Sequence, residues 1–119
     1  MADVRRIVGI DPIFVVSDLS RAVAHYEQLG FSTSYYDEGY AYARRERLTI
    51  HLAGPGFAPG AVGHGALYLH VDDAEVLAEE WRSAGVELVE PQDCEWGKRE
   101  GSHKDPDGNL IRFGSELRR

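Results

Sequence analysis

The sequence predicts an α+β protein built from two βαβββ modules, and three features of the chain support this prediction. Residues 16–31 and 71–86 match each other at a constant offset, as VSDLSRAVAHYEQLGF and VDDAEVLAEEWRSAGV. Each copy follows a short apolar run and precedes segments with strand character. Turn signals, DEG at 37–39 and DPDGN at 105–109, separate the later segments. A repeat of this length indicates two copies of one supersecondary unit.

Each module is expected to open with a short strand. The runs IFVV at 13–16 and ALYLHV at 66–71 are too short for helices and are rich in branched or aromatic residues. Because each run leads into one copy of the repeat, the pair predicts the first strand of each module.

A helix should follow each opening strand. Ser17 or Asp18 caps the first helix and Asp72 or Asp73 the second, since a side-chain oxygen there can accept an unpaired amide hydrogen of the first turn. Apolar residues then recur at steps of three and four and predict one buried stripe per helix: Leu19, Ala22, Val23 and Tyr26, then Ala74, Leu77, Ala78 and Trp81. Gly30 and Gly85 supply the left-handed residue that ends each helix.

Three more strands complete each module. They are expected at FSTSYYD (31–37), YAYARRE (40–46) and RLTIHLA (47–53), and at VELVEP (86–91), GKREGSHKD (97–105) and NLIRFGS (109–115). The chain is thus interpreted as a single domain, with one module at about 8–54, a Gly- and Pro-rich linker at about 55–64, and a second module at about 65–117. The linker is either a functional loop or a bare spacer.

Composition restricts the function. The 119 residues suffice for one ordinary domain, and the single Cys94 can form no internal disulfide, which favours a cytoplasmic location. No apolar run reaches a membrane-spanning length. The formal charge of −7 repels nucleic acid and either favours cationic partners or only aids solubility. The sequence shows no recognisable Ser, His and Asp grouping of a hydrolase and no recognisable Gly-rich phosphate-binding loop.

The opening VSDLSRAVAHYEQLGF, the element EWGKRE and the closing DPDGNLIRF, in this order and spacing, resemble the vicinal oxygen chelate superfamily. That superfamily includes glyoxalase I, extradiol dioxygenases, fosfomycin-modifying enzymes and bleomycin resistance proteins. The resemblance covers nearly the whole chain. It implies that each module curls its mixed sheet into a half-barrel and that paired modules enclose a cup where ligands bind.

The resemblance also implies four positions at which the metal enzymes of the superfamily hold their metal. In this sequence they are Asp11, His51, Ala66 and Arg112. A methyl group and a guanidinium cannot coordinate a divalent metal, so no metal is expected, although His64 lies close enough to Ala66 to be considered as a substitute. Arg112 is instead expected to pair with Asp11 in the cup and to replace the metal's charge.

The chain is most similar to the bleomycin resistance type, whose members are metal-free homodimers that sequester a cationic glycopeptide antibiotic. The function that follows is metal-independent, non-enzymatic sequestration of a small molecule by a homodimer, without a cofactor. The alternatives are a metal-dependent glyoxalase, dioxygenase or transferase, and a binder of an unrelated metabolite.

Ligand binding is assigned to aromatic and charged residues of the expected cup. Alternation places Tyr40 and Tyr42 on one face, and Trp96 before Gly97 predicts a bulge that turns the indole toward the cup or a partner. His103 is expected on the surface. The complete candidate set is Asp11, Tyr40, Tyr42, His51, Tyr68, Trp96, Arg99, Glu100 and Arg112.

Overall fold

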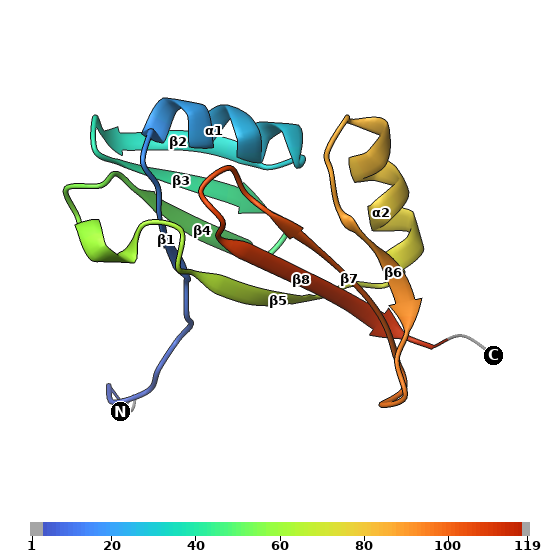
Figure 1. Ribbon diagram of the computed structural model, residues 1–119. Coiled ribbons are helices and arrows are strands. Elements are labelled where there is room, and N and C mark those ends of the chain that lie inside the picture. Colours follow the sequence, from blue (N-terminus) through green and yellow to red (C-terminus); the bar gives the residue numbers. More distant parts are fainter. Residues whose placement is uncertain (1–3, 118–119) are drawn as a thin grey trace.

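The computed structural model describes residues 4–117, which form two four-stranded sheets with one helix lying against each (Figure 1). The first module contains β1 (Ile13–Val15), α1 (Leu19–Gln28), β2 (Ser32–Asp37), β3 (Tyr40–Arg45) and β4 (Leu48–Ala53). The second contains β5 (Ala66–His70), α2 (Ala74–Ser83), β6 (Val89–Asp93), β7 (Lys98–Lys104) and β8 (Leu110–Glu116). A short 3₁₀ helix, η1 (Pro59–Ala61), lies between the modules.

The two sheets have the same topology. Their strand orders are β1-β4-β3-β2 and β5-β8-β7-β6. In each, the first strand runs parallel to the last, and the remaining neighbours are antiparallel. The predicted α+β class with two βαβββ modules and mixed sheets is therefore confirmed.

Local capping explains where the helices begin and end. The Asp18 carboxylate accepts the amide hydrogen of Arg21, and the Asp73 carboxylate accepts those of Glu75 and Val76. Asp18 and Asp73 are thus the caps among the residues considered. Gly30 and Gly85 follow the helices with φ of 90° and 81°, which an L side chain rarely adopts.

The strand after α2 begins later than the sequence predicts. Residues 86–91 were expected, whereas β6 runs from Val89 to Asp93. The amide of Val86 donates to the Trp81 carbonyl at 2.9 Å, a bond that closes the end of the helix. Val86 is thereby held in the helix-terminating turn and its side chain is buried in the core, so pairing starts three residues on.

One hydrophobic core joins both modules. Phe14, Tyr26 and Ile50 of the first module belong to the same buried cluster as Trp81 and Phe113 of the second. Because strand side chains alternate, the faces of the two sheets that point away from this core stay open. We call them the first and second open faces.

The DPDGN turn between β7 and β8 also connects the modules. The Asp105 carboxylate accepts the Tyr26 hydroxyl hydrogen at 3.0 Å, and Asp107 accepts the amide and hydroxyl hydrogens of Ser17. Asn109 Nδ2 donates to the Val15 carbonyl at 3.2 Å. A motif that predicted only a hairpin therefore fastens the second module to β1 and α1 of the first.

The linker ends against the same turn. The Gly65 amide donates to Asn109 Oδ1 at 2.8 Å, and the Gly63 amide donates to the Val15 carbonyl at 3.0 Å. Gly63 has φ of 74°, and a Cβ atom there would lie 2.1 Å from the Asp107 carbonyl oxygen. Glycine at this position is therefore required by both backbone conformation and space.

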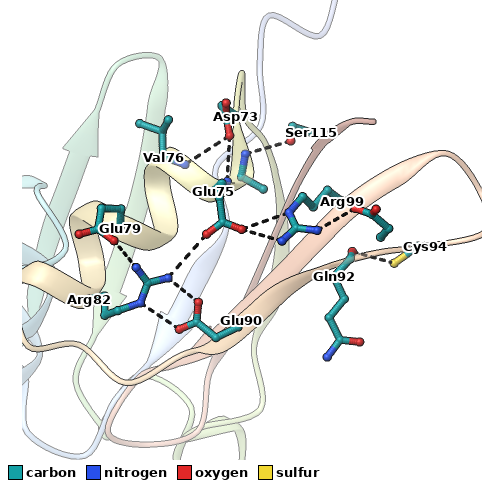
Figure 2. A network of polar contacts seen from close by, with 12 residues as sticks. Asp73, Glu75, Val76, Glu79, Arg82, Glu90, Gln92, Cys94, Arg99 and Ser115 are labelled. Atoms are coloured by element: carbon teal, nitrogen blue, oxygen red, sulfur yellow. Dashed lines mark hydrogen bonds and ion pairs between the residues drawn. The ribbon is translucent and has the colours of Figure 1, made fainter. Parts of the chain in front are cut away.

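An ion-pair network fastens α2 to its own sheet. Figure 2 shows the Glu75 carboxylate between the guanidinium groups of Arg82 and Arg99. Arg82 also pairs with Glu79 and with Glu90 of β6, and Arg99 of β7 pairs with Asp93 at 2.7 Å. These contacts lie on the helix side of the second sheet, opposite its open face.

The segment before β1 extends away from both sheets (Figure 1). Val4, Ile7, Val8 and Ile10 are 91–93% exposed. We call residues 4–12 the N-terminal arm. Over the part of the chain described, neither α-helix combines the length and hydropathy that a membrane crossing requires.

Candidate functional site

The first open face contains an aromatic row. Tyr42 on β3 lies opposite His51 on β4, and His51 lies opposite Ile13 on β1. The Tyr42 and His51 rings meet edge-on at 5.0 Å, and Tyr40, two residues from Tyr42, lies on the same face.

Three of these polar groups form a hydrogen-bonded chain. His51 Nε2 lies 3.0 Å from Asp11 Oδ2, and His51 Nδ1 lies 2.7 Å from the Tyr40 hydroxyl oxygen. An ionised carboxylate only accepts, so the imidazole proton at Nε2 is directed at Asp11. Burial, then Tyr42 and Asp11, raises the pKa of Tyr40. The chain orients His51 and keeps Tyr40 a neutral phenol.

An acidic edge borders this face. Phe57 of the linker lies 5.9 Å from the Tyr40 ring, centroid to centroid, and both line a hollow of about 400 Å³ together with Asp37 and Glu38. A neighbouring hollow of about 570 Å³ has Asp18, Asp37, Glu38 and Tyr35 in its wall. Aromatic rings and carboxylates thus occur together here, a combination suited to cationic groups.

The second open face is built around Glu100. Tyr68 on β5 lies opposite Arg112 on β8, and the Tyr68 hydroxyl donates to Glu100 Oε2 at 2.6 Å. Arg112 Nη2 donates to Glu100 Oε1 at 2.7 Å. The Glu100 side chain is only 8% exposed, and the Tyr68 hydrogen bond, with lesser effects of Trp96, Arg112 and Cys94, lowers its pKa. Glu100 is therefore an ionised anchor for its neighbours.

A glycine makes room for this cluster. A Cβ atom at Gly114 would lie 2.0 Å from the Tyr68 hydroxyl oxygen and 3.0 Å from Glu100 Cγ. Sequence reasoning missed Gly114, although a glycine inside a strand is a recognised sign of close approach. It also missed Phe57, for which the only signal was an aromatic residue within the Gly- and Pro-rich linker.

The structure separates one candidate from the others. Arg99 alternates with Glu100 and points to the helix side, where it bonds Glu75 and Asp93 (Figure 2). Its assignment to the ligand-binding face was wrong, because adjacent strand residues lie on opposite faces.

Trp96 also differs from its prediction. It lies in the tight turn between β6 and β7, where the Gly97 amide donates to the Cys94 carbonyl and the Cys94 amide to the Lys98 carbonyl. The expected bulge is a hairpin turn. Trp96 is 62% exposed, and its side chain interacts with Glu100 of the second open face.

The contact expected between Asp11 and Arg112 is not made among residues 4–117. Asp11 pairs with His51, and Arg112 pairs with Glu100. Asp11 lies in the N-terminal arm beside the first sheet, whereas Arg112 lies on β8 of the second sheet, and each pairs with a residue of the sheet that it adjoins. Arg112 is half exposed rather than buried.

The four metal positions do not suit a divalent metal. The register places Tyr68 opposite Arg112 just as Ile13 lies opposite His51, so His51 and Arg112 are equivalent positions of the two modules. Only Asp11 and His51 offer lone pairs, because Ala66 and Arg112 have none to give. In the described part of the chain, no cluster of three or more His, Cys, Asp or Glu side chains is arranged to hold a metal ion.

Tyr68 should titrate well above an ordinary tyrosine. Burial, reinforced by the hydrogen bond to Glu100, raises the pKa of Tyr68 from 10.0 to about 12. Its contribution to folding stability is then fully present below pH 10 and is lost as the pH rises toward 12. Phenolate absorbance during alkaline titration should show a transition near pH 12 that Tyr68→Phe removes and Tyr35→Phe retains. An unchanged transition near pH 12 in Tyr68→Phe would contradict this assignment.

The family model of the Glyoxalase/Bleomycin resistance protein/Dioxygenase superfamily matches residues 8–113. The chain belongs to this superfamily. The match includes both helices, the linker and every strand except the end of β8. A search of curated proteins gave no match.

Solved structures of this superfamily share the fold. A bleomycin-binding protein in complex with bleomycin superposes with a TM-score of 0.78 and is 26% identical, over 93% of this chain and 100% of that one. A bleomycin resistance determinant encoded on transposon Tn5 has a TM-score of 0.80 and 25% identity, over 94% and 100%. A glyoxalase/bleomycin resistance protein from Catenulispora acidiphila has a TM-score of 0.79 and 25% identity, over 93% and 100%.

Proposed function

We propose that this protein is a metal-independent binder that sequesters an antibiotic of the bleomycin type without changing it chemically. The observation that carries the proposal is Arg112. A guanidinium occupies a position where the metal enzymes of the superfamily need a ligand, and Glu100 holds it in place at 2.7 Å. The open faces instead offer aromatic rings and fixed charges, which suit binding better than metal chemistry.

Similarity and charge support the class of ligand. Two of the similar structures are a bleomycin-binding protein and a bleomycin resistance determinant. The net charge of −7 and the acidic edge formed by Asp18, Asp37 and Glu38 would attract a cationic molecule. Tyr40, Tyr42 and Phe57 provide flat rings next to this edge on which planar or cationic groups can stack.

A homodimer is part of the proposal. The accessible surface is 7760 Å², whereas about 6,450 Å² is typical of a monomer of this mass. The radius of gyration of 15.6 Å likewise exceeds the roughly 13.5 Å expected for this length. The difference in area, about 1,300 Å², is of the size that one partner loses in a stable dimer. The exposed aliphatic residues of the N-terminal arm would be covered in such a pair.

Calorimetric titration of metal-free bleomycin into chelator-treated protein tests the proposal. We expect a Kd of about 1 μM or tighter, near one drug per chain, and weaker binding at moderate than at low salt. Absence of heat at both salt concentrations would exclude the antibiotic and leave an unrelated metabolite as the ligand.

Metal content separates the proposal from its enzymatic alternative. A metal-dependent glyoxalase, dioxygenase or transferase would carry stoichiometric metal that Asp11→Ala and His51→Ala remove. The proposed binder should instead bind the drug equally well before and after chelation. A requirement for added metal would contradict it.

A further inference from the structure

Two stacked histidines lie at the junction of the modules, away from both open faces. His25 is on α1 and His103 is on β7, and their Nε2 atoms are 2.8 Å apart. The rings are nearly parallel, at 19°, with centroids 5.0 Å apart. His103 is only 6% exposed, so its predicted surface position was wrong. It lies on the core side of β7, where it packs against Trp81.

The hydrogen bonds determine where the protons are. His103 Nδ1 lies 2.6 Å from the Glu87 carbonyl oxygen, which can only accept, so Nδ1 carries a hydrogen. The neutral His103 ring then has a bare Nε2 atom. The hydrogen in the 2.8 Å contact must therefore belong to His25 Nε2. If both rings are protonated, two N–H groups face each other and the contact cannot persist.

The surroundings disfavour a second positive charge. Arg21 and Tyr26 face the pair from α1, Trp81 from α2, Asp105 from the turn after β7, and Glu87 through its carbonyl. Asp105 is the one carboxylate among these groups that favours protonation of His25, and it already accepts from Tyr26 and Asn109. Burial first, and then His103 and Arg21, lower the pKa of His25.

We propose that the His25–His103 pair is an acid-sensitive latch that joins the two modules at neutral pH and opens when both rings are protonated. Since the folded protein binds protons at His25 more weakly than the unfolded chain, the stabilising effect is fully present above pH 6.5. This stabilising effect is lost as the pH falls from 6.5 through the lowered pKa of His25. Opening would break the direct contact between α1 and β7, while the Tyr26–Asp105 hydrogen bond and the shared core still join the modules.

The Trp81 indole reports on the junction without a ligand. Its Nε1–H donates to the Leu29 carbonyl at 3.0 Å, from the second module to the first. We expect its hydrogen exchange, corrected for the intrinsic pH dependence, to be several-fold faster at about pH 5 than at about pH 7.5. Amides of β4 such as Ile50 and Leu52 should stay protected. Equal loss of protection in β4 would indicate global unfolding and overturn the proposal.

A matched pair of variants assigns the effect. His25→Gln keeps an N–H donor for His103 but cannot be protonated, so the acceleration in acid should be lost. His64→Gln removes an exposed histidine of the linker and should retain the acceleration of exchange in acid. Identical pH profiles for wild type and His25→Gln would overturn the proposal. So would ring ¹⁵N shifts of wild-type protein that place the His103 proton on Nε2 at neutral pH, a measurement that needs no variant.

Discussion

Asp105→Ala should lower the free energy of unfolding by about 3 kcal/mol or more, the largest stability effect expected for a polar residue of this chain. Asp105 is 4% exposed and accepts hydrogens from the Tyr26 hydroxyl, from Asn109 Nδ2 and from the Asn109 and Asp107 amides. Tyr26 and Asn109 are fully buried, so both would keep a polar group without its acceptor. An unsatisfied buried donor costs about 1–3 kcal/mol.

Urea denaturation followed by circular dichroism gives the measurement. Asp93→Ala is the matched control, because it removes the same side chain from an exposed ion pair with Arg99 and should change stability little. Asp105→Asn retains one acceptor oxygen, so its free energy of unfolding should lie between those of Asp105→Ala and Asp93→Ala. If Asp105→Ala is no more harmful than Asp93→Ala, the turn does not connect the modules as described.

Glu100→Ala should weaken bleomycin binding by at least about tenfold, a loss of about 1.4 kcal/mol. This expectation depends on the proposed function. Glu100 is nearly buried and its two oxygens are engaged by Tyr68 and Arg112, so it acts by positioning these side chains and not by attracting the drug. Without it, Arg112 loses its ion pair and Tyr68 loses its acceptor.

Glu116→Ala distinguishes positioning from long-range attraction. Glu116 lies on β8, carries the same charge, and pairs with Lys98 at the sheet end. If Glu100 acts by position, Glu116→Ala should change the affinity by less than about threefold. Equal losses in the two variants would show that only the negative field matters. Alkaline titration provides a check on the structure, because Tyr68 should titrate nearer its ordinary value in Glu100→Ala.

The features that depend on neighbouring residues could be predicted from the sequence. The helix starts to within one residue, the terminating glycines Gly30 and Gly85, and the succession of strands along the chain all follow from patterns within one module. Because the two copies match, each helix or strand recognised in one module was expected at the matching position of the other. The strand order of the two sheets is accordingly the same.

Partners distant in the sequence could not be predicted. The resemblance implied that Arg112 stands where a metal enzyme has a ligand. It did not reveal that Glu100, which lies diagonally across the β7–β8 hairpin, would pair with Arg112. His103 was expected on the surface, and only its packing against α1 and Trp81 reveals its burial. Such contacts depend on how the modules meet, which no local pattern records.

The double role of the DPDGN turn restricts how the chain can vary in length. A surface hairpin ordinarily tolerates inserted residues. Here Asp105, Asp107 and Asn109 each reach a different part of the first module, so an added residue would misalign all three contacts at once. The turn between β6 and β7 is held within its own module, where the Leu117 amide donates to the Gly97 carbonyl. That turn can therefore vary in length without parting the modules, while the β7–β8 loop must keep its length.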